Sequence, residues 1–421
     1  MDQFIMETAS IATIAITLFG AAFCVMQAKS SCVSRRFAVF LGMVAVNNVP
    51  DAFARGLAAL PDTFTQTAEL VLWTPSSLCL APLFWVYVVC LTSRVENPPV
   101  RLFRHLGLPM VALALGIIGA AGPQAVRDVL FAGEALPASG PASLFATLFV
   151  LVTGLVHLAL FPQMAIYLVL IVRRLMRHRL LLRDVYASTE AHELRWIYVI
   201  AGLGGLFWGA RTGLLVLAVN LEQPAGPPGF LSVTAMAALG LIATTTLWGV
   251  RQRPPLLPDS DDERPPEPPK PPEPAPEPEP GPQALDEPLG KKYEKSALSA
   301  EAGARIAAKL RRAMEVDHLH RDPNLSLWIL ARHIGASPNY ISQTLNEVIG
   351  ESFFDFVNGY RIAEAKSLLS AGNQSVLTIT HEVGFNSRSS FYTAFKRVTG
   401  ETPSGFRKKM SVPVGADDAV V

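Results

Sequence analysis

Charged side chains and metal-ligand patterns are both scarce in this chain of 421 residues. Only 17% of the residues are charged and half are apolar, which is unusual for a water-soluble globular protein. The four cysteines show neither metal-ligand spacing nor a disulfide framework, and three of them lie in apolar runs, which favours a packing role. The sequence also contains no HExxH, no GxSxG and no P-loop. We therefore predict no enzymatic activity, no metal site and no cofactor.

Long apolar runs, in contrast, are abundant in the first part of the chain. Seven of them lie at about 7–27, 37–59, 69–92, 106–122, 143–172, 196–220 and 228–250. A helix needs roughly 20 apolar residues to cross the hydrocarbon core of a bilayer. These runs have almost no amphipathic pattern, which argues against buried helices of a soluble protein. Residues 1–251 are predicted to form a seven-helix transmembrane bundle that contacts the lipid bilayer.

Lysine and arginine are unequally distributed among the connections between these runs. Connections 28–36, 93–105 and 173–195 together hold twelve, whereas 60–68, 123–142 and 221–227 hold only Arg127. Basic residues favour the cytoplasmic side of a membrane. The pattern places the N-terminus outside and the exit at Arg251 and Arg253 inside. Everything after residue 251 is therefore expected in the cytoplasm.

Several polar side chains fall within the predicted spans, where an ionisable group is costly in free energy and often functional. They are Asn47, Asp51, Arg55, Glu69 and Arg211. At ~1.5 Å per helical residue, Asp51 and Arg211 both lie ~20 Å from the inner end, so they are candidates for an ion pair. Glu69 is a candidate to join them or to pair with Arg55. Two interpretations stay open: a polar cavity that binds an unknown small ligand from outside, and a structural ion pair that joins two helices.

Residues 252–292 have the composition of a tether. Between Pro254 and Pro288 there are fifteen prolines and ten acidic residues. Proline at this density prevents helix formation and sheet pairing, so a disordered, extended and solvated segment is predicted. At ~3.1 Å per residue the segment would reach ~100 Å when fully extended.

The most informative stretch is 375–407, SVLTITHEVGFNSRSSFYTAFKRVTGETPSGFR. The pattern predicts a short helix from Leu377 to Val383, a turn at Gly384 that needs a positive φ, and a second helix from Ser387 to Thr399. The apolar seam of this pair is Val383, Phe385, Phe391 and Phe395, and the open face holds Arg388, Ser389, Tyr392 and Thr393. This is the layout of a helix-turn-helix at 377–399 whose second helix enters a DNA major groove.

A second motif of the same kind is predicted earlier, at 327–348. A helix at 327–334 is capped by Ser326 and ended by Gly335, and Ser337-Pro338 starts the next helix. The outward residues of that second helix are Asn339, Ser342, Gln343 and Asn346. An amphipathic helix at 299–315 precedes the motif, and a longer helix at 352–370 joins the two motifs.

These motifs resemble the AraC/XylS family of bacterial transcription regulators. The resemblance is carried by Ile379, Gly384-Phe385, Ser387, Phe391, Phe395-Lys396, Gly400, Thr402-Pro403 and Phe406-Arg407, by the pattern L-x-x-x-A-x-x-x-G-x-S-x-x-Y-[IL]-S from Leu327, and by residues 360–365 of the joining helix. Thr380 departs from a usual alanine, and Thr344-Leu345 from a bulkier pair. The resemblance implies an all-α double helix-turn-helix domain at 293–410, followed by a disordered tail at 411–421.

Such a domain would place both recognition helices in successive major grooves of double-stranded DNA. The predicted base contacts are Asn339, Ser342, Gln343, Arg388, Ser389, Tyr392 and Thr393; the predicted phosphate contacts are Asn346, Lys396, Arg397, Arg407 and Lys408. Arg388 is the best candidate to bind guanine, because its guanidinium can contact O6 and N7 together. Arg361 is interpreted either as a phosphate contact or, preferably, as paired with a carboxylate. Residues 291–410 hold seventeen basic and eleven acidic side chains, a formal charge of +6 that suits phosphate binding.

The sequence thus predicts a transcription regulator anchored in the bacterial inner membrane, with a seven-helix bundle that senses a signal. Coupling is expected through dimerisation or confinement of the DNA-binding domain near the membrane, because a flexible tether transmits rigid motion poorly. A second copy of the chain and RNA polymerase are further candidate partners. The alternatives are a transporter or membrane enzyme with an attached DNA-binding feedback module, and a bundle that only anchors the chain.

Overall fold

The computed structural model describes residues 2–27, 31–58, 67–95, 98–121, 141–190, 192–220, 230–252, 256, 300–372 and 374–411. Almost all of the predicted tether and tail lies outside these ranges. The chain divides into two units, which are described separately: Met1–Met176 with Leu194–Leu257, and Arg177–Glu193 with Pro258–Val421. Apart from one isolated antiparallel bridge, the described residues are helical or irregular.

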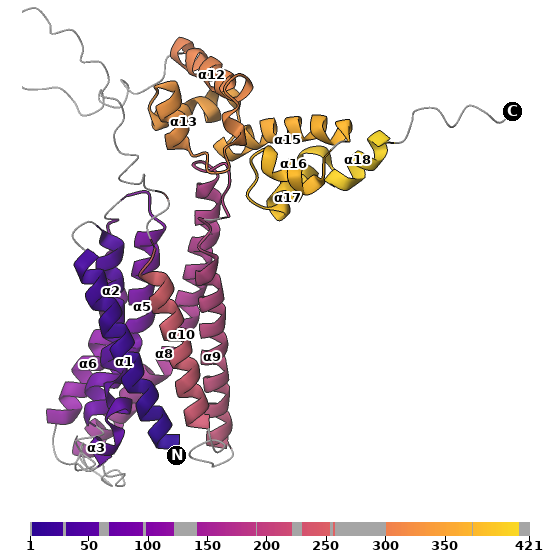
Figure 1. Ribbon diagram of the computed structural model, residues 1–421. Helices are drawn as coiled ribbons and strands as arrows, with labels where there is room; N and C mark the ends of the chain where they lie inside the picture. The colour runs from indigo at the N-terminus through magenta and orange to yellow at the C-terminus, as the bar shows by residue number, and fades with distance from the viewer. Residues whose placement is uncertain are drawn as a thin grey trace, which may run out of the picture. The chain divides into compact units, whose positions relative to one another are not determined.

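Long helices that run side by side form the first unit (Figure 1). Their bounds are α1 Asp2–Gln27, α2 Cys32–Ala52, α5 Thr74–Leu91, α6 Phe103–Ala121, α8 Pro141–Leu182, α9 Arg195–Asn220 and α10 Phe230–Gly249, with the short α3 Ala54–Ala58 and the π-helical η1 Glu69–Trp73 beside them. Each of the seven predicted apolar runs coincides with one long helix. The all-helical prediction is confirmed for this part of the chain.

Among the described residues, five stretches of helix are long and apolar enough to cross a membrane, judged by length and composition: Asp2–Gln27, Leu70–Leu91, Phe103–Ala121, Leu144–Leu182 and Ser232–Gly249. Helices α2 and α9, the second and sixth predicted spans, are not among them. Charged and amide side chains lower the hydropathy of α2, and most side chains of α9 from residue 211 onward are not described.

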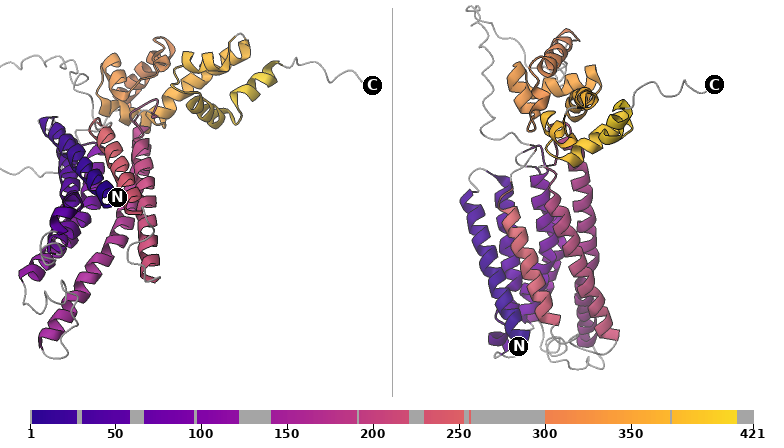
Figure 2. Two further views of the ribbon diagram at one scale, coloured as in Figure 1. Left: turned by 60° about the horizontal axis from the view of Figure 1, so that its bottom comes forward. Right: turned by 45° about the vertical axis from the view of Figure 1, so that its right-hand side comes forward.

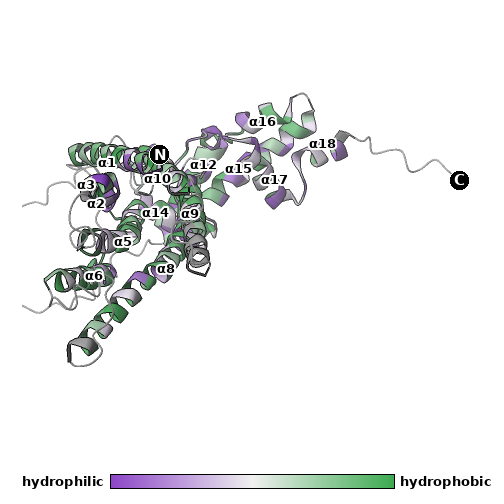
Figure 3. Ribbon diagram, turned by 90° about the horizontal axis from the view of Figure 1, so that it is seen from below, coloured by the Kyte–Doolittle hydropathy of each residue, from purple (hydrophilic) through white to green (hydrophobic). Residues whose placement is uncertain are grey.

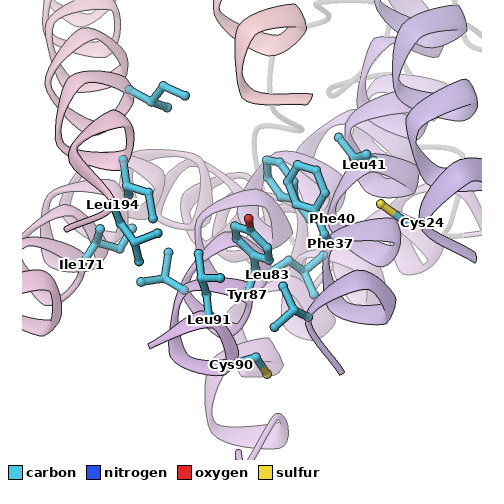
Figure 4. Packing of buried hydrophobic residues seen from close by; sticks show 14 of the residues in the cluster. Cys24, Phe37, Phe40, Leu41, Leu83, Tyr87, Cys90, Leu91, Ile171 and Leu194 are labelled. Carbon is cyan, nitrogen blue, oxygen red and sulfur yellow. The ribbon is translucent and has the colours of Figure 1, made fainter. Parts of the chain in front are cut away.

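A cluster of aromatic side chains holds several of these helices together (Figure 4). The rings of Phe37 and Tyr87 lie 4.6 Å apart between centroids, and Phe40 and Phe84 extend the cluster across α2 and α5. Gly249 of α10 permits the close approach, because a Cβ at that position would overlap the ring of Phe37. Helix α1 packs against α2 and α10, and α5 packs against both α2 and α6.

Hydrophobic residues predominate along the helices of this unit (Figure 3). Phe19, Met26, Leu206 and Val233 each expose more than two-thirds of their surface. Exposed apolar surface spread along several long helices is typical of proteins whose surroundings are not water.

Nine short and medium helices make up the described part of the second unit after residue 299 (Figure 2). They are α12 Ala300–Glu315, η2 Leu319–Arg321, α13 Leu327–Ile334, α14 Pro338–Gln343, η3 Thr344–Ile349, α15 Phe353–Ala371, α16 Val376–Glu382, α17 Arg388–Thr399 and α18 Pro403–Ser411. The second helix predicted for the motif at 327–348 changes from α to π geometry at Thr344. The hydroxyl of that buried threonine donates to Tyr340 O at 2.8 Å, so the departure from the family pattern leaves no unsatisfied group.

Serine caps determine where five of these helices begin. Ser326, Ser337, Ser352, Ser375 and Ser387 each accept a hydrogen bond from the backbone N–H three residues later. Such a cap satisfies one of the N–H groups that a helix start leaves without a partner. The caps predicted at Ser326, Ser337 and Ser387 are confirmed.

The helices after residue 299 enclose two hydrophobic cores, and α15 contributes side chains to both. The first contains Leu310, Leu330, Ile341 and Phe353; the second contains Ile362, Ile379, Phe391 and Phe395. All four seam residues predicted for 377–399 are buried. Helix α15 therefore connects two halves, α12–η3 and α16–α18, each with its own helix pair.

Candidate nucleic-acid interface

The turn between α16 and α17 depends on Gly384. Its φ is +94°, a conformation that side chains with a Cβ rarely adopt. A Cβ there would also lie 2.5 Å from His320 O and 2.8 Å from Arg321 O. Glycine is therefore required here for two reasons. The turn needs a positive φ, and residues 320–321, which precede the first helix pair, lie too close for a Cβ.

The predicted base-reading face of α17 is open. Arg388, Ser389 and Thr393 are exposed, and Tyr392 is half-buried. The Arg388 guanidinium lies 4.9 Å from the centroid of the Tyr392 ring and donates to its hydroxyl at 3.0 Å. The Tyr392 hydroxyl is also within 3.1 Å of Ser404 Oγ on α18. This hydrogen bond, together with Arg388, holds the pKa of Tyr392 below its ordinary value although burial acts in the opposite direction. Tyr392 and Arg388 therefore hold each other in position on the open face of α17.

The corresponding face of the first helix pair is less uniform. Asn339 and Asn346 are exposed, whereas Ser342 and Gln343 are half-buried. The Gln343 amide donates to Glu347 at 2.9 Å, which occupies one of its donors. Tyr340, which was not among the predicted contacts, exposes 42% of its surface next to Asn339. An aromatic residue in the first turn after the Ser337-Pro338 start was the signal that could have identified it.

The predicted phosphate contacts differ in their surroundings. Lys396 and Lys408 are exposed at the ends of α17 and α18. Arg397 pairs with Asp355 of α15 at 2.7 Å and lies 5.3 Å from the centroid of the Phe354 ring, so it also joins α17 to α15. Arg407 is half-buried, and its Nε and Nη2 have no hydrogen-bond acceptor among the described residues. The base and phosphate roles themselves stay predictions.

Arg361 is fully buried in α15, which corrects both earlier interpretations. Its Nε donates to His320 O at 2.6 Å and its Nη2 to Asp322 O at 2.7 Å, and the guanidinium lies 5.3 Å from the Phe385 ring centroid. A buried side chain does not reach a DNA phosphate, and its hydrogen-bond partners here are mainly carbonyls rather than a carboxylate. Burial lowers the pKa of Arg361 to about 10, so it remains charged at neutral pH. Arg361 thus contacts both residues 320–322, which precede the first helix pair, and Phe385 of the second pair, and this position at the joint between the two helix pairs gives it a structural role.

Two residues of the predicted polar site of the first unit have described partners. Arg55 pairs with Glu7 of α1 through both its backbone N–H and its guanidinium, whereas the role of Glu69, beside Arg55 or beside Asp51 and Arg211, stays a prediction. Asn47 donates to Ser76 Oγ at 2.9 Å and Ser77 Oγ at 2.7 Å. Glu7 was missed, although an acidic residue at the start of the first apolar run was a visible signal.

The proposed pair between Asp51 and Arg211 lies partly outside the described side chains. Those of Arg211 and Glu69 are not described, whereas Asp51 is half-buried. In the part of the chain that the structure covers, no group of three or more His, Cys, Asp or Glu side chains is arranged to hold a metal ion.

Comparison with known proteins agrees with this geometry at the C-terminal end. A family model described as a helix-turn-helix domain matches residues 330–409. The arabinose operon regulatory protein of Escherichia coli is 35% identical over 91 residues, which are 22% of this chain and 31% of that protein. A protein of Streptomyces lividans named as an AraC-like transcription regulator is 33% identical over 97 residues, 23% of this chain and 32% of the relative.

A solved structure is also similar to this part of the chain. The C-terminal domain of AraT, a response regulator from Geobacillus stearothermophilus, is 26% identical and is covered to 95%, with 27% of this chain aligned and a TM-score of 0.24. The chain spans about a third of the length of the two named regulators that it matches. Both of these matched relatives are named as regulators.

Proposed function

Because the C-terminal domain is of the AraC type of helix-turn-helix regulators, we propose that this chain is a sequence-specific, membrane-anchored transcription regulator. The observation that carries the proposal is α15, which joins two helix-turn-helix pairs whose second helices, α14 and α17, each present exposed polar side chains. Two recognition helices on one connecting helix suit successive major grooves of one DNA duplex.

Specific binding is assigned mainly to Arg388 on α17 and Asn339 on α14. Arginine reads guanine and asparagine reads adenine through paired hydrogen bonds in the major groove. Tyr392 holds the Arg388 guanidinium in place, which reduces the entropy that is lost on binding a base. Lys396 and Lys408 supply phosphate contacts that do not depend on sequence.

The membrane location is supported by the apolar helices and by charge. The five described helices that are long and apolar enough to cross a membrane, together with α2 and α9, account for seven spans. Connection 173–195 holds six arginines, and three of them, Arg177, Arg179 and Arg183, lie in the same unit as the DNA-binding domain. A cytoplasmic position for this connection agrees with the positive-inside rule. On this basis the N-terminus faces outward and the first unit senses a signal at or across the membrane.

The first unit has two alternative functions. It could be a transporter or membrane enzyme with the DNA-binding domain attached as a feedback module, or it could be a bundle that only anchors the chain. No observation in the described residues favours the first. Replacing residues 1–251 with an unrelated seven-span anchor tests the second, because unchanged regulation would show that the bundle has no sensory role.

The DNA-binding proposal is tested by mapping chromosomal sites that the full chain occupies and measuring affinity for those fragments. Arg388→Ala is expected to weaken specific binding by ~1–3 kcal/mol and to relax one base position. Arg305→Ala, an exposed arginine on α12, is the matched control. Equal loss on every DNA sequence would identify Arg388 as a phosphate contact instead, and no loss would refute its role.

Membrane topology is tested separately with reporter fusions. Alkaline phosphatase, which is active only outside the cytoplasm, should be active when fused after Arg127 and inactive when fused after Arg179. Activity at both positions, or at neither, would contradict the proposed orientation.

A further inference from the structure

The connection between α8 and α9 pairs with the backbone of the DNA-binding domain. Within the second unit, Ala187 N donates to Leu325 O at 3.2 Å and Leu327 N donates to Val185 O at 2.8 Å, on either side of the antiparallel bridge between Tyr186 and Ser326. A third bond runs from Phe354 N to Arg183 O at 2.9 Å. The bonded N–H groups of residues 327 and 354 lie in the first turns of α13 and α15. Such groups have no partner within their own helix, and here residues 183–185 supply it.

Side chains of the same connection are part of the hydrophobic core of the first half. Ala187 is 1% exposed and packs in the cluster with Leu325, Leu330 and Phe353. The ring of Tyr186 meets Trp328 edge-on at 5.8 Å between centroids. The connection therefore contributes a buried side chain to this core and does not merely contact its surface.

The connection also completes the surroundings of the buried Arg361. Nη1 of Arg361 donates to Ser188 Oγ at 3.1 Å and to Ala187 O at 3.4 Å, and Asn358 Nδ2 donates to Ala187 O at 3.2 Å. A buried charge is costly unless hydrogen bonds satisfy it. If the connection left, Arg361 would lose two of its acceptors at the joint between the two helix-turn-helix pairs.

We propose that residues 183–188 are a docking segment whose binding to α13 and α15 keeps the two helix-turn-helix pairs in the orientation that DNA requires. The docking segment, and not the proline-rich tether, then carries the signal, because it follows directly on Leu182, the last residue of α8. A change at the end of α8 would shift the balance between docked and released states and with it the affinity for DNA. This inference rests on the proposed function and specifies its regulation.

Docking itself is tested by a disulfide in the full chain. Tyr186 and Ser326 form a non-hydrogen-bonded antiparallel pair, in which Cα atoms lie about 4.5 Å apart, within the range that a disulfide spans. A protease site is inserted near residue 275, and Tyr186→Cys is combined with Ser326→Cys. After oxidation and cleavage, the C-terminal fragment should stay attached on a non-reducing gel and be released by reductant.

The controls are each cysteine alone and Tyr186→Cys with Ala308→Cys, at an exposed position of α12. Release of the fragment from the oxidised Tyr186→Cys, Ser326→Cys protein would overturn docking. This readout requires neither DNA binding nor a membrane, so its failure is distinguishable from failure of the proposed function.

Coupling is tested by releasing the segment. Ala187→Arg cannot be accommodated in the core, so we expect at least tenfold weaker binding of the full chain to chromosomal fragments selected by the wild-type protein. Ala308→Arg introduces the same side chain at an exposed site and should bind like wild type. Equal affinity of these two variants would overturn the coupling.

If Ala187→Arg unfolds the domain, as detected by proteolysis, Ser188→Ala replaces it. That variant removes one acceptor of Arg361 and should lower affinity several-fold with an unchanged proteolytic pattern. The oxidised disulfide protein should retain wild-type affinity. No loss in Ser188→Ala, or lost affinity in the locked protein, would contradict the proposal.

Discussion

Gly384 provides the sharpest test of the second helix pair, since the structure separates two costs of replacing it. Gly384→Ala introduces a Cβ at a φ of +94°, where it would meet His320 O at 2.5 Å. Gly400→Ala introduces the same atom at a φ of +80°, where nothing lies within 4 Å. The pair of variants therefore distinguishes backbone strain from steric overlap.

Backbone strain and steric overlap together determine how much each variant should lower the free energy of unfolding. A left-handed conformation costs a non-glycine residue about 1–2 kcal/mol, and this alone is expected for Gly400→Ala. Gly384→Ala adds an overlap with backbone atoms that no side-chain rotation relieves, and overpacking of this kind typically costs about 1–3 kcal/mol more. We expect Gly384→Ala to destabilise the domain by ~2–5 kcal/mol, a large part of the stability of a typical domain.

Pulse proteolysis in urea measures this on the full chain, with the surviving C-terminal fragment detected by a terminal tag. The midpoint of Gly384→Ala should lie well below that of Gly400→Ala. Equal midpoints would refute the close approach between the α16–α17 turn and residues 320–321, and with it the described joint.

Three further predictions concern other contacts. Arg361→Met should destabilise the domain by ~2–6 kcal/mol in the same assay, because the carbonyls of His320 and Asp322 lose their donor at about 1–3 kcal/mol each; a neutral result would contradict its role at the joint. In Glu364, hydrogen bonds from Arg321 and His320 outweigh the effect of burial and hold the pKa below its ordinary value of 4.5, so its stabilising contribution is present above that pH and is lost on acidification through the lowered pKa. Glu364→Gln should therefore flatten the acid limb of the stability profile, and an unchanged profile would rule out this origin. Glu7→Gln should lower the thermal stability of the detergent-solubilised chain, because it removes the ion pair with Arg55. The double variant Glu7→Gln, Arg55→Gln should be little less stable than Glu7→Gln alone; fully additive losses would show that the two side chains do not interact.

Local signals explain why much of the second unit was predictable from the sequence. A serine cap and a glycine stop act within four residues, so the start of α13 at Leu327 and its end before Gly335 follow from neighbouring residues. The apolar seam of 377–399 likewise follows from helical spacing. The change to π geometry at Thr344 carries no comparable local signature.

Long-range partners were not predictable in the same way. The acceptors of Arg361 come from residues 187, 188, 320 and 322, which no spacing rule brings together. The arginines of connection 173–195 were interpreted only as a signal of membrane topology. The hydrogen bonds of Val185 and Ala187 to the DNA-binding domain were not predicted. In the first unit, Arg55 pairs with Glu7, which lies 48 residues earlier and was not among the predicted site residues.

The position of Ala187 in the first core has a consequence for how this protein is divided. The family model matches residues 330–409. These limits leave out Ala187, a buried residue of the first core that lies more than a hundred residues upstream. A gene fragment that begins after the tether therefore encodes an incomplete fold. Exchange of this domain between regulators as one contiguous cassette would separate it from that piece, so chimaeras should be built with both segments moved together.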